Sequence, residues 1–231
     1  MSLILRDRPK SLTLTYIGVF AALNALADLV PFTPILGVPG ASFRFGWVAS
    51  CLTGVLLGPS TGVVSCLIGG SISLLTGQAQ IFGPFSPLRP AISALISGML
   101  ISERWKVPAT ILLLLVSVWL SMPVGRDAAA ILVFHITGLA IMLSLRKIPA
   151  KLARSRQIRD NLWGLFLISY CANISRHLFG NIILAALYHL EPVYFVAAAP
   201  ITLIEQLTFA MGTTILAAPL NRLPLGRLQQ E

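Results

Sequence analysis

The sequence predicts an all-α integral membrane protein, and two observations carry that prediction. Of the 231 residues, 56% are hydrophobic and only 11% are charged, with a mean hydropathy of +0.84. A soluble domain of this size needs more charge to cover its surface. The apolar residues also form continuous stretches suited to a hydrocarbon core of about 30 Å, without the alternation of a membrane β-barrel. Since lipid offers no hydrogen-bond partners, such stretches must be helices.

Eight apolar segments follow one another in what we interpret as a single membrane domain over residues 1–231. We therefore expect a bundle of about six to eight transmembrane helices, several of them shorter than the ~20 residues of an ordinary span. The segments cover residues 12–30, 45–57, 60–77, 87–101, 107–122, 127–145, 161–187 and 196–219. Gly58 and Pro59 separate the second from the third, and Pro87 and Pro90 open the fourth. Short helices with such connections are tolerated at membrane depth only under cover of protein or around a cavity, which favours an enclosed site.

The basic residues predict the orientation of the bundle. The net charge is +9, and with the N-terminus inside, the cytoplasmic segments hold 13 of the 17 Lys and Arg residues. These are Arg6, Arg8, Lys10, Arg104, Lys106, Arg146, Lys147, Lys151, Arg154, Arg156, Arg159, Arg222 and Arg227. The outer segments hold only Arg44, Arg89 and Arg126, so we expect both termini to be cytoplasmic, in a plasma membrane. No basic patch interleaved with aromatics is present, which argues against a nucleic-acid partner.

Three expected outer loops are rich in Pro, Gly and aromatic residues. They are residues 31–44 (PFTPILGVPGASFR), 78–86 (QAQIFGPFS) and 188–195 (YHLEPVYF). This composition favours ordered loops that pack over an apolar ligand. A belt of interfacial aromatics explains the same composition, and the sequence leaves both interpretations open.

The motifs of several enzyme classes are missing from the sequence. It contains no GxxxxGK[ST] loop, no HExxH, no paired cysteine motif and no G-x-S-x-G, so we predict no ATPase, no catalytic residue, no metal and no cofactor. The three cysteines fall within apolar segments, where buried thiols usually serve packing. Any energy for transport must then come from a gradient or from partner subunits.

Polar side chains inside apolar segments are the candidate ligand contacts. Asn173, His177 and Asn181 share one helical face, with Arg176 at its edge. Glu205 and Gln206 lie in the next segment, and His177 and Glu205 both fall roughly 15 Å below the loop that joins the two segments. They either line a cavity together or form a buried His–Glu or Arg–Glu pair that holds the helices together.

Further candidates lie nearer the outer face. Asn24 and Asp28 share a face of the first segment, and Arg44 and Arg89 border the outer side, where each is either an interfacial anchor or a ligand contact. The aromatic candidates are Trp47, Phe85 and Tyr188, together with Phe82 and Tyr194. The arginines favour a carboxylate-bearing ligand and the acidic residues favour a cation; we favour an anionic or zwitterionic ligand. The first segment also carries small residues at four-residue spacing, which permit close helix approach: Gly18, Ala21, Ala22 and Ala25.

The order of these features resembles the substrate-binding S components of energy-coupling factor (ECF) transporters. The run YIGVFAALNALADLVPF resembles the first helix of that family, and FRFGWVASCLTGVLLGPSTGVVSCLIGGSIS resembles its second and third helices with their Gly-Pro-x-x-Gly turn. The run HLFGNIILAALYHLEPVYFVAAAPITLIEQLTFAMGTTIL resembles its last helix pair. Residues 12–101 thus correspond to helices 1–4 and residues 161–219 to the last two. The family usually has six helices, so residues 107–145 are an apparent added hairpin.

The resemblance implies a function that composition does not show. Members capture a water-soluble vitamin or similar micronutrient from outside, beneath the outer loops, and deliver it through an ABC importer. Their partners are a transmembrane T component, which contacts the small-residue face of the first helix, and two cytoplasmic ATPases. Two other classes remain as alternatives: a gradient-driven secondary transporter, for which internal repeats are expected, and an intramembrane enzyme using His177 and Glu205 as acid and base.

Overall fold

The computed structural model describes residues 10–78 and 80–221, and this part of the chain is almost entirely helical. The elements in order are α1 (Lys10–Ala27), β1 (Pro31–Pro34), β2 (Ser42–Arg44), α2 (Gly46–Leu57), α3 (Pro59–Leu75), η2 (Gln80–Phe85), α4 (Leu88–Ile101), α5 (Lys106–Ser121), α6 (Pro123–Asp127), η3 (Ala129–Ile131), α7 (Leu132–Leu145), α8 (Ile148–Ala153), α9 (Ile158–Tyr188) and α10 (Pro192–Leu220). The helical class expected from the sequence is confirmed. The number of helices that cross a membrane remains a prediction.

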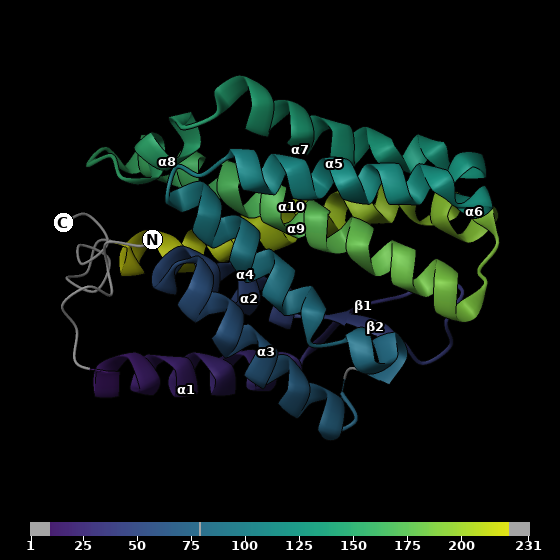
Figure 1. The fold of residues 1–231 in the computed structure, drawn as a ribbon, viewed down its shortest axis with the longest axis horizontal. Coiled ribbons are helices and arrows are strands. Elements are labelled where there is room, and N and C mark those ends of the chain that lie inside the picture. The colour runs from purple at the N-terminus through teal and green to yellow at the C-terminus, as the bar shows by residue number, and fades with distance from the viewer. Residues whose placement is uncertain (1–9, 79, 222–231) are drawn as a thin grey trace.

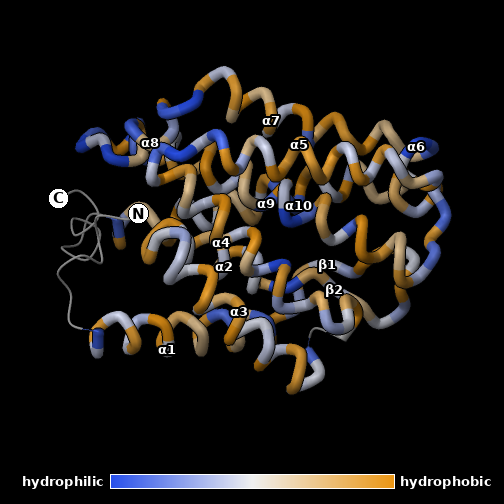
Figure 2. The backbone as a smooth tube through the Cα atoms, viewed as in Figure 1, coloured by the Kyte–Doolittle hydropathy of each residue, from blue (hydrophilic) through white to orange (hydrophobic). Residues whose placement is uncertain are grey.

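The helices run back and forth between two ends of the molecule (Figure 1). One end carries the start of α1, the end of α10 and the short helix α8; we call it the α8 end. The other carries the antiparallel strands β1 and β2 together with η2 and α6; we call it the sheet end. Figure 2 shows hydrophilic segments around α8 and also at the opposite end around α6, with many hydrophobic residues along the helices between the two ends.

Large apolar side chains cover the outside of the helices instead of being confined to the core. Leu14, Leu114, Val133, Ile204 and Ile215, from four different helices, are each more than half exposed. Two of the described helices, α1 and α10, are long and apolar enough to cross a membrane, and four shorter helices are also apolar. A surface of this kind suits contact with lipid better than contact with water.

The longest helix, α9, occupies the centre of the bundle. It packs against α4, α7, α8 and α10, and most of its side chains are buried. Its polar residues therefore face other helices, which explains why it is less apolar than its neighbours.

Glycines allow α2, α3 and α4 to approach one another closely. A Cβ on Gly54 would meet the backbone of Ala94, and one on Gly98 would meet the backbone of Pro59. Gly58, between α2 and α3, has a positive φ of 78°, which permits the sharp reversal there. This packing brings the first turns of α2 and α4 together at the sheet end.

Two sequence-based boundaries differ in the structure. The expected loop at residues 188–195 is mostly helical, because α10 already begins at Pro192, a residue suited to the first helical turn. The expected helix at residues 127–145 is divided into the end of α6, η3 and α7. The expected 107–145 hairpin is otherwise present as α5 and α7, packed against α9.

Helix α1 packs on one side of the bundle against α3 and α2. Ala21 is buried, and its carbonyl lies where a Cβ on Gly69 would be. Gly18 and Ala22 are exposed and Ala25 is half-buried. Ala21 therefore packs within the chain, where α3 covers it. Gly18 and Ala22 remain exposed on the outer side of α1, and Ala25 is exposed in part.

Candidate substrate-binding site

A polar pocket lies at the sheet end, where α1, α2, α4, α9 and the segment around η2 meet. It encloses about 400 Å3 of empty space, its opening included. We call it the arginine pocket; its lining is Asp28, Ser42, Arg44, Trp47, Gln78, Ile81, Phe82, Ser86, Arg89, Pro90 and Arg176. The first turn of α2 supplies Trp47, and the first turn of α4 supplies Arg89.

Two buried guanidinium groups define the chemistry of the arginine pocket. Arg176 donates from Nη1 to the carbonyl of Gly46 at 3.1 Å and to Ser50 Oγ at 2.6 Å, but its Nε has no partner. Arg89 has no hydrogen-bond partner for Nε or Nη2. Both groups lie against the Trp47 ring, at 4.4 Å for Arg176 and 5.1 Å for Arg89, and Arg89 also lies 3.5 Å from the centre of the Phe82 ring.

Neither buried arginine forms an ion pair with a residue that the structure describes. Within residues 10–78 and 80–221 the two ion pairs both involve Glu103, at the α8 end. Aromatic rings stabilise cations only partly, and a buried charge without a counterion is costly. The pocket holds three arginines but only one acidic residue, Asp28, and some of the arginine N–H groups have no partner. It therefore suits an anionic ligand, above all a carboxylate.

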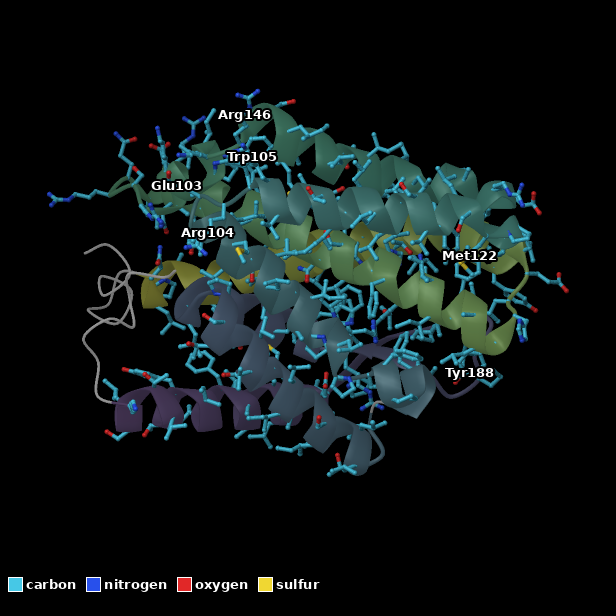
Figure 3. All side chains as sticks on the ribbon, in the orientation of Figure 1. Glu103, Arg104, Trp105, Met122, Arg146 and Tyr188 are labelled. Carbon is cyan, nitrogen blue, oxygen red and sulfur yellow. The ribbon has the colours of Figure 1, made fainter. Side chains whose placement is uncertain are left out.

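A third arginine forms the rim of the pocket. Arg44 donates from Nη1 to the carbonyl of Asp28 at 2.7 Å and to Gln78 Oε1 at 2.9 Å. Arg44 and Gln78 also line a broad hollow at the sheet end, formed by the loop between β1 and β2, the end of α3 and Tyr188. The arginine pocket thus adjoins the surface of the sheet end, and Figure 3 shows Tyr188 there, far from Glu103 and Arg104 at the α8 end.

A second cleft, mostly apolar, lies beside the arginine pocket between β1, η3, α9 and α10. It has about 580 Å3 of empty space, its mouth included. Three polar candidates line this cleft, which we call the histidine cleft: His177, Asn181 and Glu205. Glu205 accepts a hydrogen bond from the Thr33 hydroxyl of β1.

Aromatic rings form the wall between the two cavities. The Phe43 ring lies 5.3 Å from the Trp47 ring, and the rings of Phe43 and Trp47 each lie 6.3 Å from His177. Phe209 stacks on Trp47 at 5.2 Å. These rings lie between the polar groups of the two cavities, and no residue lines both of them.

The site residues expected from the sequence fall into three groups. Asp28, Arg44, Trp47, Arg89 and Arg176 line the arginine pocket, and His177, Asn181 and Glu205 line the histidine cleft. The rest lie outside both cavities: Asn24, Phe85, Asn173, Tyr188 and Gln206.

The residues of this third group have varied surroundings. Asn24 donates to the carbonyl of Phe20 and to Thr53 Oγ1, which ties α1 to α2. Asn173 and Gln206 are buried with both amide atoms unpartnered, and Phe85 and Tyr188 are exposed. A ligand role for these five residues remains a prediction.

The expected alternative, a buried pair between His177 or Arg176 and Glu205, is not formed in the described part of the chain. Glu205 bonds to Thr33, Arg176 bonds to α2, and His177 bonds to His135 of α7. Sequence reasoning missed Thr33, Phe43 and His135. For His135 a signal was present, because it is a histidine within an apolar segment.

No family model matches the chain. It is similar to an uncharacterised protein of Methanocaldococcus jannaschii, with 26% identity over 207 residues that cover 88% of this chain and 68% of that protein. Among solved structures it is similar to the S-component for biotin from an ECF-type ABC transporter, with a TM-score of 0.50 over 94% of this chain and 95% of that chain. This chain has the S-component fold.

At 15% identity, the match to this S component establishes the fold alone. It confirms the resemblance recognised in the sequence at the level of the fold. The S-component fold is that of a transporter subunit, which agrees with the apolar outer surface of the helices.

The unpaired arginine leads to a stability prediction. We expect Arg89→Met to leave the free energy of unfolding of the ligand-free protein unchanged or raise it by about 1–4 kcal/mol, because it removes a buried charge without a counterion. Arg154→Met is the matched control: its guanidinium bonds to Glu103 at 2.9 Å and to the Ile101 carbonyl, so its loss should cost about 1 kcal/mol. Thermal unfolding in detergent measures the stability of both variants. A larger loss of stability in Arg89→Met than in Arg154→Met would contradict the prediction.

Proposed function

We propose that this chain is the substrate-capturing subunit of an ECF-type ABC importer for a small, anionic, water-soluble vitamin or related micronutrient. The carrying observation is the arginine pocket. Two buried guanidinium groups without a carboxylate partner lie beneath the surface of the sheet end. A carboxylate bound there would accept the free N–H groups and offset the cost of the buried charges.

The ligand would bind across both cavities. Its carboxylate would lie between Arg89 and Arg176, and its less polar part would lie against the aromatic wall and the histidine cleft. The solved neighbour is an S-component for biotin, and biotin combines a carboxylate with a compact ring system. Biotin is therefore the first known vitamin to test, within a wider panel of carboxylate vitamins.

The protein would span the plasma membrane several times, with the sheet end outside. The basic residues Arg104, Arg146, Lys147 and Lys151 lie near the α8 end, which the positive-inside rule assigns to the cytoplasm. In that orientation the opening of the arginine pocket beside Arg44 faces the exterior, as capture from outside requires.

The chain carries no phosphate-cradling motif, so transport would depend on partners. We propose that the chain assembles with a T component and with two cytoplasmic ATPases, which hydrolyse ATP. The exposed small residues Gly18 and Ala22 would contact the T component. A subunit without a motor can release its ligand only if partners bind one of its states better than another.

Native mass spectrometry tests the function directly. We expect the purified chain to hold one small anionic molecule in 1:1 ratio and to show no ATPase activity. Arg89→Met should weaken binding by about 2–5 kcal/mol because the carboxylate loses a buried charged partner, whereas Arg154→Met should retain the ligand. A purified chain that binds no carboxylate vitamin, or an Arg89→Met variant that binds as well as the natural chain, would overturn the proposed function.

Cysteine labelling tests the orientation. The native cysteines Cys51, Cys66 and Cys171 are buried, so introduced thiols can be read separately. Both Glu191, at the sheet end, and Lys151, in α8, are exposed. An impermeant maleimide should label Glu191→Cys on intact cells and Lys151→Cys only after lysis. The reverse pattern would place the sheet end in the cytoplasm.

Substitution on α1 tests the partners. We expect Ala22→Trp to abolish most co-purification of the co-expressed T component and ATPases while leaving ligand binding unchanged, because Ala22 is exposed and outside both cavities. Leu23→Trp is the matched control, since Leu23 is exposed on another face of α1. Equal co-purification of both variants would exclude this face as the docking surface.

A further inference from the structure

A pair of stacked histidines connects the added hairpin to the histidine cleft. His135 of α7 and His177 of α9 have ring centres 5.5 Å apart and planes within 17° of parallel. His135 Nε2 lies 3.3 Å from His177 Nδ1, and His135 Nδ1 lies 3.1 Å from the carbonyl of Ile131. His177 lines the cleft, whereas His135 does not.

The hydrogen-bond partners determine which ring nitrogens of His135 and His177 carry hydrogen. A carbonyl only accepts, so Nδ1 of His135 carries a hydrogen. His135 is fully buried and forms no ion pair with a carboxylate in the described chain, so its ring is neutral and its Nε2 is an acceptor. His177 must then donate from Nδ1, which leaves its Nε2 without hydrogen. The structure places Asn181 Nδ2, an amide donor, 3.4 Å from His177 Nδ1. With a hydrogen on that ring nitrogen, the Asn181 amide must be turned so that its oxygen faces the histidine.

This arrangement gives the cleft a definite hydrogen-bonding character. Nε2 of His177 is a free acceptor at the wall of the cleft, with no hydrogen-bond partner among the residues described. On the other side of the cleft, Glu205 contributes carboxyl oxygens, one of which accepts from Thr33. A ligand group that meets these atoms must bring hydrogens of its own, since a buried acceptor left unpaired costs affinity.

We propose, building on the proposed function, that His135 is a positioning residue that holds His177 with Nε2 as acceptor, and that the ligand is a carboxylate bearing an N–H donor, such as a ureide, amide or lactam. The carboxylate would occupy the arginine pocket and the N–H would reach His177. Trp47 spans the two positions, because its ring lies 4.4 Å from the Arg176 guanidinium and 6.3 Å from the His177 ring.

The α5–α7 hairpin would hold the histidine pair in place. Two of the three members of the hydrogen-bonded series belong to it, because His135 lies in α7 and Ile131 closes η3, whereas His177 lies in α9. The hairpin packs on α9 at this level, where a Cβ on Gly138 would overlap the side chain of Ile174. It thereby holds His135 against His177, while its own Ile131 and Phe134 line the histidine cleft.

Nitrogen NMR tests the positioning role without any ligand. The chain has three histidines, so selective 15N-histidine labelling yields few signals, and the variant His189→Gln identifies one of them. We expect His177 to be neutral with hydrogen on Nδ1. His135→Leu should shift His177 toward the other tautomer, and His135→Gln, whose amide oxygen can accept in place of Nε2, should restore the original one. Hydrogen on Nε2 of His177 in the unaltered protein would overturn the assignment, as would an unchanged tautomer in His135→Leu.

A matched pair of vitamins tests the ligand class. Biotin and lipoic acid share a valerate tail, but only biotin carries N–H donors. We expect the full chain to bind biotin about tenfold more tightly than lipoic acid, and His135→Leu, but not His135→Gln, to remove that difference. Equal affinities for the two acids would overturn the N–H donor inference and leave the carboxylate pocket, and with it the proposed function, intact. Loss of both affinities in Arg89→Met but not in Arg154→Met would show that the pocket itself is correctly assigned.

Discussion

The architecture depends on keeping the polar face of α9 away from lipid. This helix carries Asn173, Arg176, His177 and Asn181 at buried positions, and a helix with that face toward hydrocarbon would leave several polar groups without partners. Helices α4, α7, α8 and α10 surround it, and their own apolar faces remain on the outside. Enclosure of α9 is thus both the condition for stability and the origin of a polar interior.

Enclosure alone does not satisfy the charges that it buries. Ser50 and the Gly46 carbonyl satisfy part of Arg176, and aromatic rings provide an attractive surface for Arg89, but several N–H groups stay free. In contrast, Arg154 at the α8 end is engaged with Glu103 and a carbonyl. Arginine side chains therefore have different roles at the two ends of the molecule. Arg154 at the α8 end is paired, whereas Arg89 and Arg176 at the sheet end keep N–H groups that a ligand can bind.

The α5–α7 hairpin belongs to the same plan. The α5–α7 hairpin covers a side of α9, and through His135 it contacts a residue of the histidine cleft. This hairpin can thus influence the histidine cleft in two ways. Its residues Ile131 and Phe134 line the cleft, and His135 can control the hydrogen-bonding state of His177.

The sequence by itself determined the helical class, the positions of the apolar segments and the S-component resemblance, because these follow from local composition and from the order of motifs. It also identified Arg176, His177 and Glu205 as candidates, since polar residues within apolar segments are costly and stand out, and Arg44 and Arg89 because they border the outer side. It mistook the 188–195 loop, where the helix-initiating role of Pro192 outweighed the loop-like composition. Only the tertiary structure showed that the candidates line two cavities, that Glu205 and His177 share one cleft without bonding to each other, and that His135 of another helix contacts His177. Those relations join residues far apart in the chain, and they depend on how helices rotate and pack, which no local pattern of residues encodes.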